Sequence, residues 1–431
     1  MRIAPLRPGL GHGLLHGPLL SGWAAVIWRF AGPAQDRRHD LPDFERNIRK
    51  RETSGAGHTF MPRVGSNERR RGPLENRVPA EPRHPITRTI DSPESARPGW
   101  SARIRRFRKH YRRHGRRHLI TVTQALPLYA LYGLMRALPL DLASGLGGWV
   151  GRTLGPRLGA SRRADANLRL VMPELSAAER EGVIRGMWDN LGRVIAEFPH
   201  LGRLRRSEAR RPRRIQVEGI EHFLAARDGG RGVVMAIGHF GNWEVGAAVA
   251  ANHGVPFTAI ARPPKNPLVG RLLHRIRSSV GTIMLEKRME GSDAKRALSV
   301  LRAGGVLGMM VDQRYNGGLK VPFMGHDAMT SPGAVSMAYH LGCAVIPVRI
   351  ERLVGARYRA VFEPPLAMPR SGDRKADIEA ATIALNEVVE GWVRARPEQW
   401  LWLHKRWMMP RPRKLRQRVL AYKASLATLK D

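Results

Sequence analysis

The chain has 431 residues, a formal net charge of +38 at pH 7 and one cysteine. Its length has room for two or three domains, and its charge favours an anionic partner: nucleic acid, acidic lipid or an acidic carrier protein. The single cysteine, Cys343, excludes an intramolecular disulfide and a zinc site built from several cysteines.

Residues 1–100 are predicted to be a disordered extension. They are rich in Arg, Pro, Gly and His and show no sustained apolar period, so burial would not offset the cost of ordering them. The uncharged stretch 10–28 mimics a signal peptide, but Gly, His and Pro interrupt it. We interpret this region as a non-folding extension of the kind that an upstream start codon adds.

A basic segment, 101–118, precedes a hydrophobic segment, 119–160. The stretch from Leu119 to Met135 has 17 residues without a formal charge, which is the lower limit for a bilayer-spanning helix, and it contains Pro127. Arginines on both sides disfavour a clean crossing. We expect a helix that lies in or dips into the cytoplasmic leaflet, with arginines on acidic headgroups. A single span and a buried helix of a soluble domain are the alternatives.

Residues 161–410 are predicted to form a globular α/β domain, followed by a basic tail, 411–431. Apolar strands alternate with helices, which is typical of a sheet covered on both faces. The predicted strands are 232–237, 257–260, 305–311, 343–350 and 357–363. The predicted helices begin after Ser176 in a capping box, at 245, after Asn266, at 293 and at 376. Cys343 opens a core strand and is interpreted as a small buried hydrophobe rather than a nucleophile.

The segment from His239 to Glu244 carries the strongest chemical signal. It follows the predicted strand 232–237, and a strand end beside a helix start can bring an imidazole and a carboxylate within hydrogen-bonding distance. We predict that Glu244 orients His239 as a general base. Asn242 is the expected N-cap, and free N–H groups between Gly241 and Trp243 suit a developing oxyanion.

The same segment has a plainer interpretation. A His-x4-Glu spacing occurs often by chance, and Glu244 can simply favour the helix N-terminus through the helix dipole. No serine or cysteine nucleophile is evident beside His239. If the pair is catalytic, the hydroxyl group comes from a substrate.

Four further residues are candidates for substrate contacts. Arg262 follows the strand 257–260, and Arg277 lies on the polar face of the helix after Asn266; both suit a phosphate or a carrier protein. Asp312 and Gln313 sit at another strand end and are candidates for substrate contact; Asp312 suits substrate hydroxyls or a supporting role in the site. The alternatives are solvated charges for the arginines and a turn cap for Asp312-Gln313.

The order of motifs resembles that of the lipid A biosynthesis acyltransferases of Gram-negative bacteria, the late lauroyl and myristoyl transferases. The resemblance covers roughly residues 120–410. After the hydrophobic segment it rests on Asn167-Leu168, Pro173–Ser176, Trp188, Asn190–Arg193, His239–Glu244, Asp312-Gln313, Val321–Gly325 and Pro397–Trp402. Two features depart from the family pattern: Arg314 after Asp312-Gln313, and the long basic extension.

The resemblance implies a glycerophosphate-acyltransferase-like mixed sheet flanked by helices, with an N-terminal membrane-associated helix. It implies transfer of a fatty acyl group from acyl carrier protein to a hydroxyl of a lipid A precursor, at the cytoplasmic face of the inner membrane with its anionic lipids. No metal, organic cofactor or nucleic acid is expected. The catalytic and substrate-binding residues would be His239, Glu244, Gly241, Asn242, Trp243, Arg262, Arg277, Asp312 and Gln313.

Three alternative functions stay open from the residues. The nearest is an acyltransferase that acts on glycerol phosphate, a lysophospholipid or another glycolipid, although Asn-Trp-Glu after the histidine argues against the glycerol phosphate branch. The second is a metal hydrolase that uses His239, Glu244, Asp312 and His326. The third is a nucleic-acid binder, which rests on charge alone because no recognition module is evident.

Overall fold

The computed structural model describes residues 100–210, 214–255, 257–261, 264–286 and 292–407. The predictions for 1–99, for Arg262 and for the tail 411–431 lie outside the described residues. The described residues from Ile120 to Trp407 belong to one compact unit.

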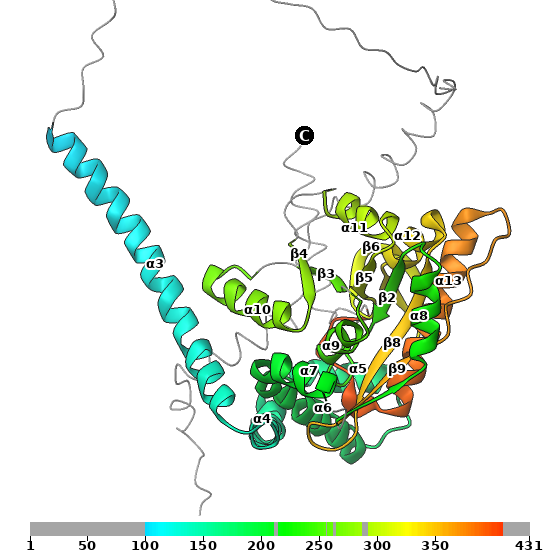
Figure 1. The fold of residues 1–431 in the computed structure, drawn as a ribbon. Coiled ribbons are helices and arrows are strands. Elements are labelled where there is room, and N and C mark those ends of the chain that lie inside the picture. The colour runs from blue at the N-terminus through cyan, green and yellow to red at the C-terminus, as the bar shows by residue number, and fades with distance from the viewer. Residues whose placement is uncertain (1–99, 211–213, 256, 262–263, 287–291, 408–431) are drawn as a thin grey trace, which may run out of the picture. The chain divides into compact units, whose positions relative to one another are not determined.

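The centre of this unit is a seven-stranded sheet in the order β1-β9-β8-β2-β5-β3-β4 (Figure 1). Neighbouring strands run parallel except β8 and β9, which are antiparallel. The strands are β1 (Ile215–Glu218), β2 (Val233–Ile237), β3 (Phe257–Ala261), β4 (Thr282–Glu286), β5 (Val306–Met310), β8 (Ala344–Arg352) and β9 (Tyr358–Phe362). The sheet is therefore mixed and mainly parallel, as predicted.

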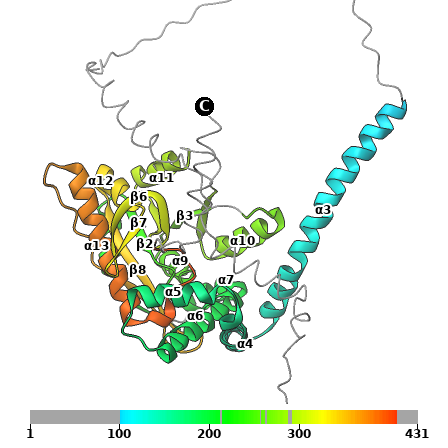
Figure 2. The same ribbon diagram turned by 180° about the vertical axis from the view of Figure 1, so that it is seen from behind.

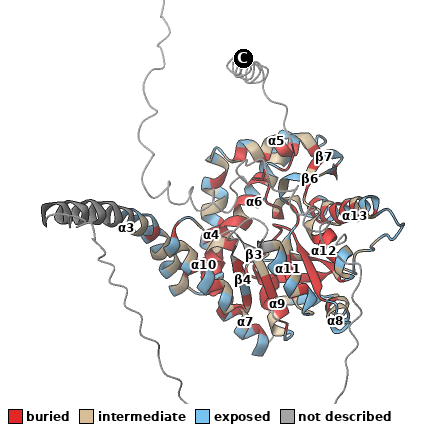
Figure 3. Cartoon of the chain, turned by 90° about the horizontal axis from the view of Figure 1, so that it is seen from above, coloured by how far each residue is buried: buried red, intermediate tan, exposed pale blue. Residues whose placement is uncertain are grey.

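Alternate residues of β2 pack into two separate cores. Val234 and Ala236 face one cluster, whereas Val233, Met235 and Ile237 face the other, because successive side chains of a strand point to opposite faces. All five residues are buried, since both faces are covered. Figure 3 shows the strands in the buried colour and the outward helix faces in pale blue.

Helices cover both faces of the sheet, as the view from behind also shows (Figure 2). The first core is formed with α5 (Ser161–Val171), α6 (Ala177–Glu197), α11 (Ser292–Arg302), α12 (Gly333–Leu341) and α13 (Arg374–Ala395). The second is formed with α7 (Leu201–Arg210), α8 (Ile220–Asp228), α9 (Val245–Asn252) and α10 (Pro267–Ser279). Short 3-10 turns lie at Gly155–Arg157, Phe198–His200 and Pro397–Gln399.

Local signals located most element boundaries. The Ser176 capping box is present, and the side chain of Asn266 accepts hydrogen bonds from the N–H groups of Leu268 and Val269 at the start of α10. The expected N-cap at Asn242 is wrong. Helix α9 begins after Glu244, and the amide of Asn242 donates instead to the buried Glu197 at 2.7 Å.

A hairpin of β6 (Arg314–Phe323) and β7 (His326–Thr330) is absent from the sequence prediction. It docks on α13, where Glu390 accepts the N–H of Met324 at 2.6 Å and Asn386 donates to the carbonyl of Pro322 at 2.8 Å. These contacts join segments far apart in the chain, so no local pattern announces them.

The hydrophobic segment 119–160 forms the C-terminal half of α3 (Trp100–Ala137), which contains Pro127, and α4 (Leu140–Leu154). Within the part of the chain that the structure describes, no helix combines the length and apolarity needed to cross a bilayer. Helix α3 packs against α10, because Tyr129 donates to the carbonyl of Leu268 at 3.1 Å and Asn266 donates to that of Thr121 at 2.8 Å. Several large apolar side chains of α3 and α4 nevertheless face outward.

Candidate active site

His239 follows β2 at the carboxyl end of the central parallel strands. Its Nδ1 atom lies 2.8 Å from Oδ1 of Asp312, and its backbone N–H donates to Oδ2 of the same carboxylate at 2.6 Å. Asp312 comes just after β5, the strand beside β2. Parallel strands end at one edge of a sheet, and this brings together two residues that lie 73 positions apart.

The predicted pairing of His239 with Glu244 is not formed, and this part of the prediction is wrong. The two oxygens of Glu244 accept from Nη2 and Nε of Arg277 on α10, at 2.6 and 3.1 Å. A planar guanidinium matches a carboxylate with two parallel hydrogen bonds, and both side chains are largely buried. The charge of Glu244 raises the pKa of Arg277.

The Asp312 carboxylate is completely buried and has three hydrogen-bond donors. Besides the two from His239, the indole N–H of Trp400 donates to Oδ2 at 2.9 Å. Burial by itself raises the pKa of Asp312, but the charge and hydrogen bonds of His239 outweigh it and hold that pKa well below its usual range. Asp312 is therefore ionised, and the Nδ1–H of His239 is the donor to it.

This tautomer leaves Nε2 of His239 as the proton acceptor. The Nε2 amide group of Gln313 lies 3.2 Å from that nitrogen, and Gln313 is exposed. The basic nitrogen thus lies next to the side chain of an exposed residue. A hydroxyl group that takes the place of the Gln313 amide would lie within proton-transfer distance.

Two aromatic rings flank His239. The ring centroids of Trp243 and His404 lie 5.1 and 4.8 Å from that of His239, both edge to face. Burial, and after it the charge of neighbouring His239, lowers the pKa of His404 to about 3. His404 is therefore neutral near pH 7 and does not compete for the proton that His239 takes.

The turn after His239 depends on Gly241. Its φ is +53°, and a Cβ atom at this position would lie 1.8 Å from the carbonyl oxygen of Ile350. Its N–H donates to the carbonyl of Gln399 at 3.0 Å and is not free for an oxyanion. Within the described residues, the N–H groups of Asn242 and Trp243 have no hydrogen-bond partner. They are the remaining candidates for the predicted oxyanion site.

A buried ionic network holds this turn from behind. Arg352 on β8 pairs with both oxygens of Glu197, and Glu197 also accepts from the side chain of Asn242. Asn190 on α6 donates to the carbonyl of Gly241 at 2.9 Å and accepts from Arg352 at 2.8 Å. The side chain of Asn242 is thus engaged in the network, and the predicted substrate contact of this residue stays with its backbone N–H.

Six of the predicted site residues fall into two groups. His239, Trp243, Asp312 and Gln313 come together, although Asp312 lies behind His239 as its partner and not as a substrate ligand. Glu244 and Arg277 form a separate ion pair. The charge of Arg277, which was predicted to contact a phosphate or a carrier protein, is therefore already paired. Among the described residues no group of three or more His, Cys, Asp or Glu side chains could hold a metal ion, so the hydrolase set with His326 is not assembled there.

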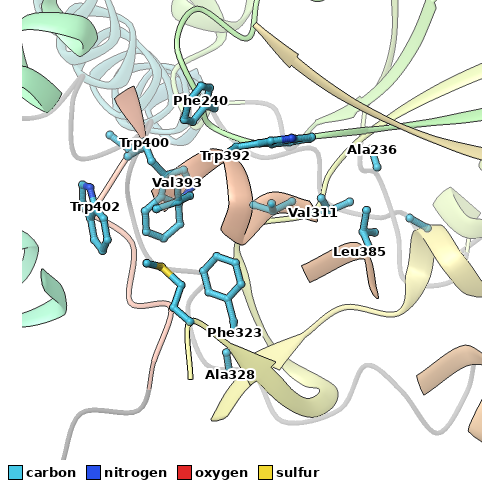
Figure 4. Close-up of a cluster of buried hydrophobic side chains, with 14 of the residues drawn as sticks. Ala236, Phe240, Val311, Phe323, Ala328, Leu385, Trp392, Val393, Trp400 and Trp402 are labelled. Carbon is cyan, nitrogen blue, oxygen red and sulfur yellow. The ribbon is translucent and has the colours of Figure 1, made fainter. Parts of the chain in front are cut away.

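Sequence reasoning missed Trp400, His404 and Glu197 as parts of this site. Trp400 and His404 lie in the segment from Pro397 to Trp407, of which only Pro397–Trp402 entered the sequence analysis, as part of the family resemblance. Trp400, Trp402 and Trp407 are all buried, and the first also reaches Asp312. Figure 4 shows the aromatic and aliphatic side chains that surround Trp400, with Phe240 and Val393 beside it.

Residues 111–409 match the model of the family described as bacterial lipid A biosynthesis acyltransferase. The chain belongs to this family. Among its relatives, a lipid A biosynthesis acyltransferase of Haemophilus influenzae is 28% identical over 63% of this chain and 83% of its own length. A lipid A biosynthesis lauroyltransferase of Escherichia coli is 28% identical over 56% and 76%.

The similarity extends beyond lipid A enzymes. A phosphatidylinositol mannoside acyltransferase of Mycolicibacterium smegmatis is 26% identical over 64% of this chain and 88% of its own length. The names of these relatives have acyl transfer in common and differ in the glycolipid that they give.

Proposed function

We propose that this lipid A acyltransferase family member transfers a fatty acyl group from acyl carrier protein to a hydroxyl of a lipid A precursor. The observation that carries the proposal is the His239–Asp312 pair, with the basic nitrogen facing the exposed Gln313. The described hydrogen-bond partners of His239 are Asp312, Gln313 and Leu401, so its proton would come from a substrate hydroxyl and not from an enzyme nucleophile.

The reaction follows from this geometry. The acceptor hydroxyl displaces the Gln313 amide and gives its proton to Nε2 of His239 as its oxygen attacks the thioester carbonyl. Asp312 stabilises the imidazolium that forms. The N–H groups of Asn242 and Trp243 are placed at the same turn as candidates for the oxyanion. The C–S bond then breaks, and the departing thiolate takes the proton from His239, which restores the base and leaves an ester.

Surface charge supports an acidic carrier protein as donor. Helices α7 and α10 pack against each other and expose Arg203, Arg206, Arg271 and Arg275. Outside Glu208, which is buried, the two helices contain no acidic residue. A cationic surface attracts an acidic partner and raises its association rate.

We propose a position at the cytoplasmic face of the inner membrane, and exposed apolar side chains support contact with a membrane surface. Leu142, Leu146 and Trp149 recur at helical spacing on α4, and Trp149 is 54% exposed. Such a stripe suits the headgroup region of a bilayer, where a lipid acceptor would also lie.

The mycobacterial relative favours a second candidate, acyl transfer to another glycolipid such as a phosphatidylinositol mannoside. A matrix of purified reactions separates the two: acyl carrier protein or coenzyme A thioesters as donors, and lipid A precursor or phosphatidylinositol mannoside as acceptors. We expect turnover with the carrier-protein donor and the lipid A precursor. Turnover confined to the mannoside, or to coenzyme A thioesters, would overturn the assigned acceptor or donor.

A deletion strain tests the same proposal in the cell. Mass spectrometry of lipid A from that strain should show the loss of one secondary fatty acid, whose mass gives the acyl chain that is transferred. Unchanged lipid A would contradict the proposal.

A further inference from the structure

The C-terminal segment that follows α13 is joined to the His239 turn by its backbone. The carbonyl of Gln399 accepts the N–H of Gly241 at 3.0 Å, and the N–H of Leu401 donates to the carbonyl of His239 at 3.1 Å. Phe240 and Trp400 form a β-bridge between the two segments. The position of Trp400 is therefore fixed relative to His239 by main-chain hydrogen bonds.

The indole of Trp400 binds Asp312 through the carboxylate oxygen that does not contact the imidazole of His239. Its Nε1–H donates to Oδ2 of Asp312 at 2.9 Å, while Oδ1 accepts from Nδ1 of His239 at 2.8 Å. Trp400 is completely buried, and its ring is packed edge to face against Trp402 at 4.8 Å. The hydrogen bond thus has little freedom to move.

We propose that Trp400 is a positioning residue for acyl transfer, which acts on His239 through Asp312. An indole N–H only donates and does not titrate, so it holds the carboxylate in one orientation at every working pH. It also takes up part of the negative charge of Asp312, which limits how strongly that carboxylate attracts the proton on His239. The inference rests on the proposed function, because it assumes that His239 is the base.

Replacement of the indole by a phenyl ring tests this role. Trp400→Phe removes the donor to Asp312 and keeps an aromatic ring, and we expect kcat to fall about tenfold, the scale of losing one hydrogen bond to a charged group. Without that donor Asp312 attracts the His239 proton more strongly. The limb of the kcat/KM profile that reports neutral His239 should therefore move to higher pH. The other titratable or charged groups around Asp312, His404 and Arg406, are unchanged in this variant.

Trp402→Phe is the matched control. Trp402 belongs to the same segment and the same aromatic cluster and is also completely buried, but its indole N–H donates to the carbonyl of Pro397 at 2.7 Å. A purely structural role predicts similar effects for the two variants. We expect the pH profile of Trp402→Phe to match that of the unaltered protein. Equal losses in both variants, with neither profile displaced, would overturn the inference.

Two further measurements keep the test decisive. In an Asp312→Asn background, Trp400→Phe should have little added effect on kcat, because its target is already altered; full additivity contradicts the inference. If Trp400→Phe does not fold, Trp400→Leu also lacks a hydrogen-bond donor and should show the same upward displacement. A fully active His239→Ala enzyme would refute the proposed mechanism itself, whatever the Trp400 variants do.

Discussion

His239 and Asp312 show how a single residue acquires its role from a partner far away in the chain. The imidazole contacts Asp312, Trp243 and His404, and its Nε2 atom lies 3.2 Å from the amide of the exposed Gln313. Glu244, although five positions from His239, is turned to Arg277 on another helix. Neutralising Asp312 and neutralising Glu244 should therefore have different effects on turnover.

Asp312→Asn should lower kcat by about 10²- to 10⁴-fold, because an amide cannot hold the Nδ1–H tautomer or stabilise the imidazolium. Glu244→Gln should cost less, because it weakens a contact to Arg277 and leaves the His239–Asp312 pair in place. Steady-state kinetics with the carrier-protein donor measures both values. A Glu244→Gln variant that is more impaired than Asp312→Asn, with its fold intact, would restore Glu244 as the partner of the base.

Burial of His404 predicts a pH-dependent stability. Its pKa is about 3 in the folded protein, against about 6.5 in an unfolded chain, so the unfolded state binds a proton first as the pH falls. As the pH falls from 6.5 to 3, this group should therefore lower the free energy of unfolding by up to about 1.4 kcal/mol per pH unit. Urea unfolding at several pH values should show a smaller acid loss for His404→Phe; identical slopes would contradict the burial effect.

At the scale of secondary-structure elements, the turn between β2 and α9 sets the position of His239. This turn has no regular hydrogen bonding of its own beyond the start of α9, and it is held by Asn190, Gln399 and the Glu197–Arg352 pair. Buried ion pairs contribute little net stability against apolar replacements, but loss of one partner is strongly destabilising. The network therefore fixes the conformation of the turn.

Gly241→Ala should destabilise the protein by more than about 3 kcal/mol, because it adds a collision with the carbonyl of Ile350 to the cost of a left-handed backbone. Gly325→Ala is its control: φ is +73° there too, but no atom lies within 4 Å of the added methyl group. The control should lose about 1 kcal/mol. Chemical unfolding compares the two, and equal losses would show that the turn relaxes around the methyl group.

For the molecule as a whole, the outward-facing apolar side chains of α4 predict attachment to lipid. The joint change of Leu142, Leu146 and Trp149 to serine should weaken binding to vesicles that contain anionic lipid by tenfold or more, since burial of one such side chain contributes about 1.5–3 kcal/mol. Val354→Ser is a suitable control, because Val354 is 70% exposed in the turn between β8 and β9. Sedimentation with vesicles measures the effect. Unchanged binding of the triple variant would place the contact elsewhere.

Much of the fold was predictable because its signals are local. The predicted strands and the helices with defined starts agree with the structure to within two residues, since apolar runs and caps such as Ser176 and Asn266 act over one helical turn. Edge strands β1 and β4 and the β6–β7 hairpin were not predicted. Strand β1 is mostly exposed and only four residues long, so it lacks an apolar run.

By itself the sequence determined an α/β unit with a histidine at the end of a buried strand, because apolar periodicity and turn chemistry depend on neighbouring residues. Only the tertiary structure decided the partner of that histidine. Strand order placed Asp312 at the adjacent strand end, and the returning C-terminal segment brought Trp400 to the same carboxylate. Hydrogen bonds depend on distance in space, and spacing along the chain gave Glu244 the role that Asp312 has.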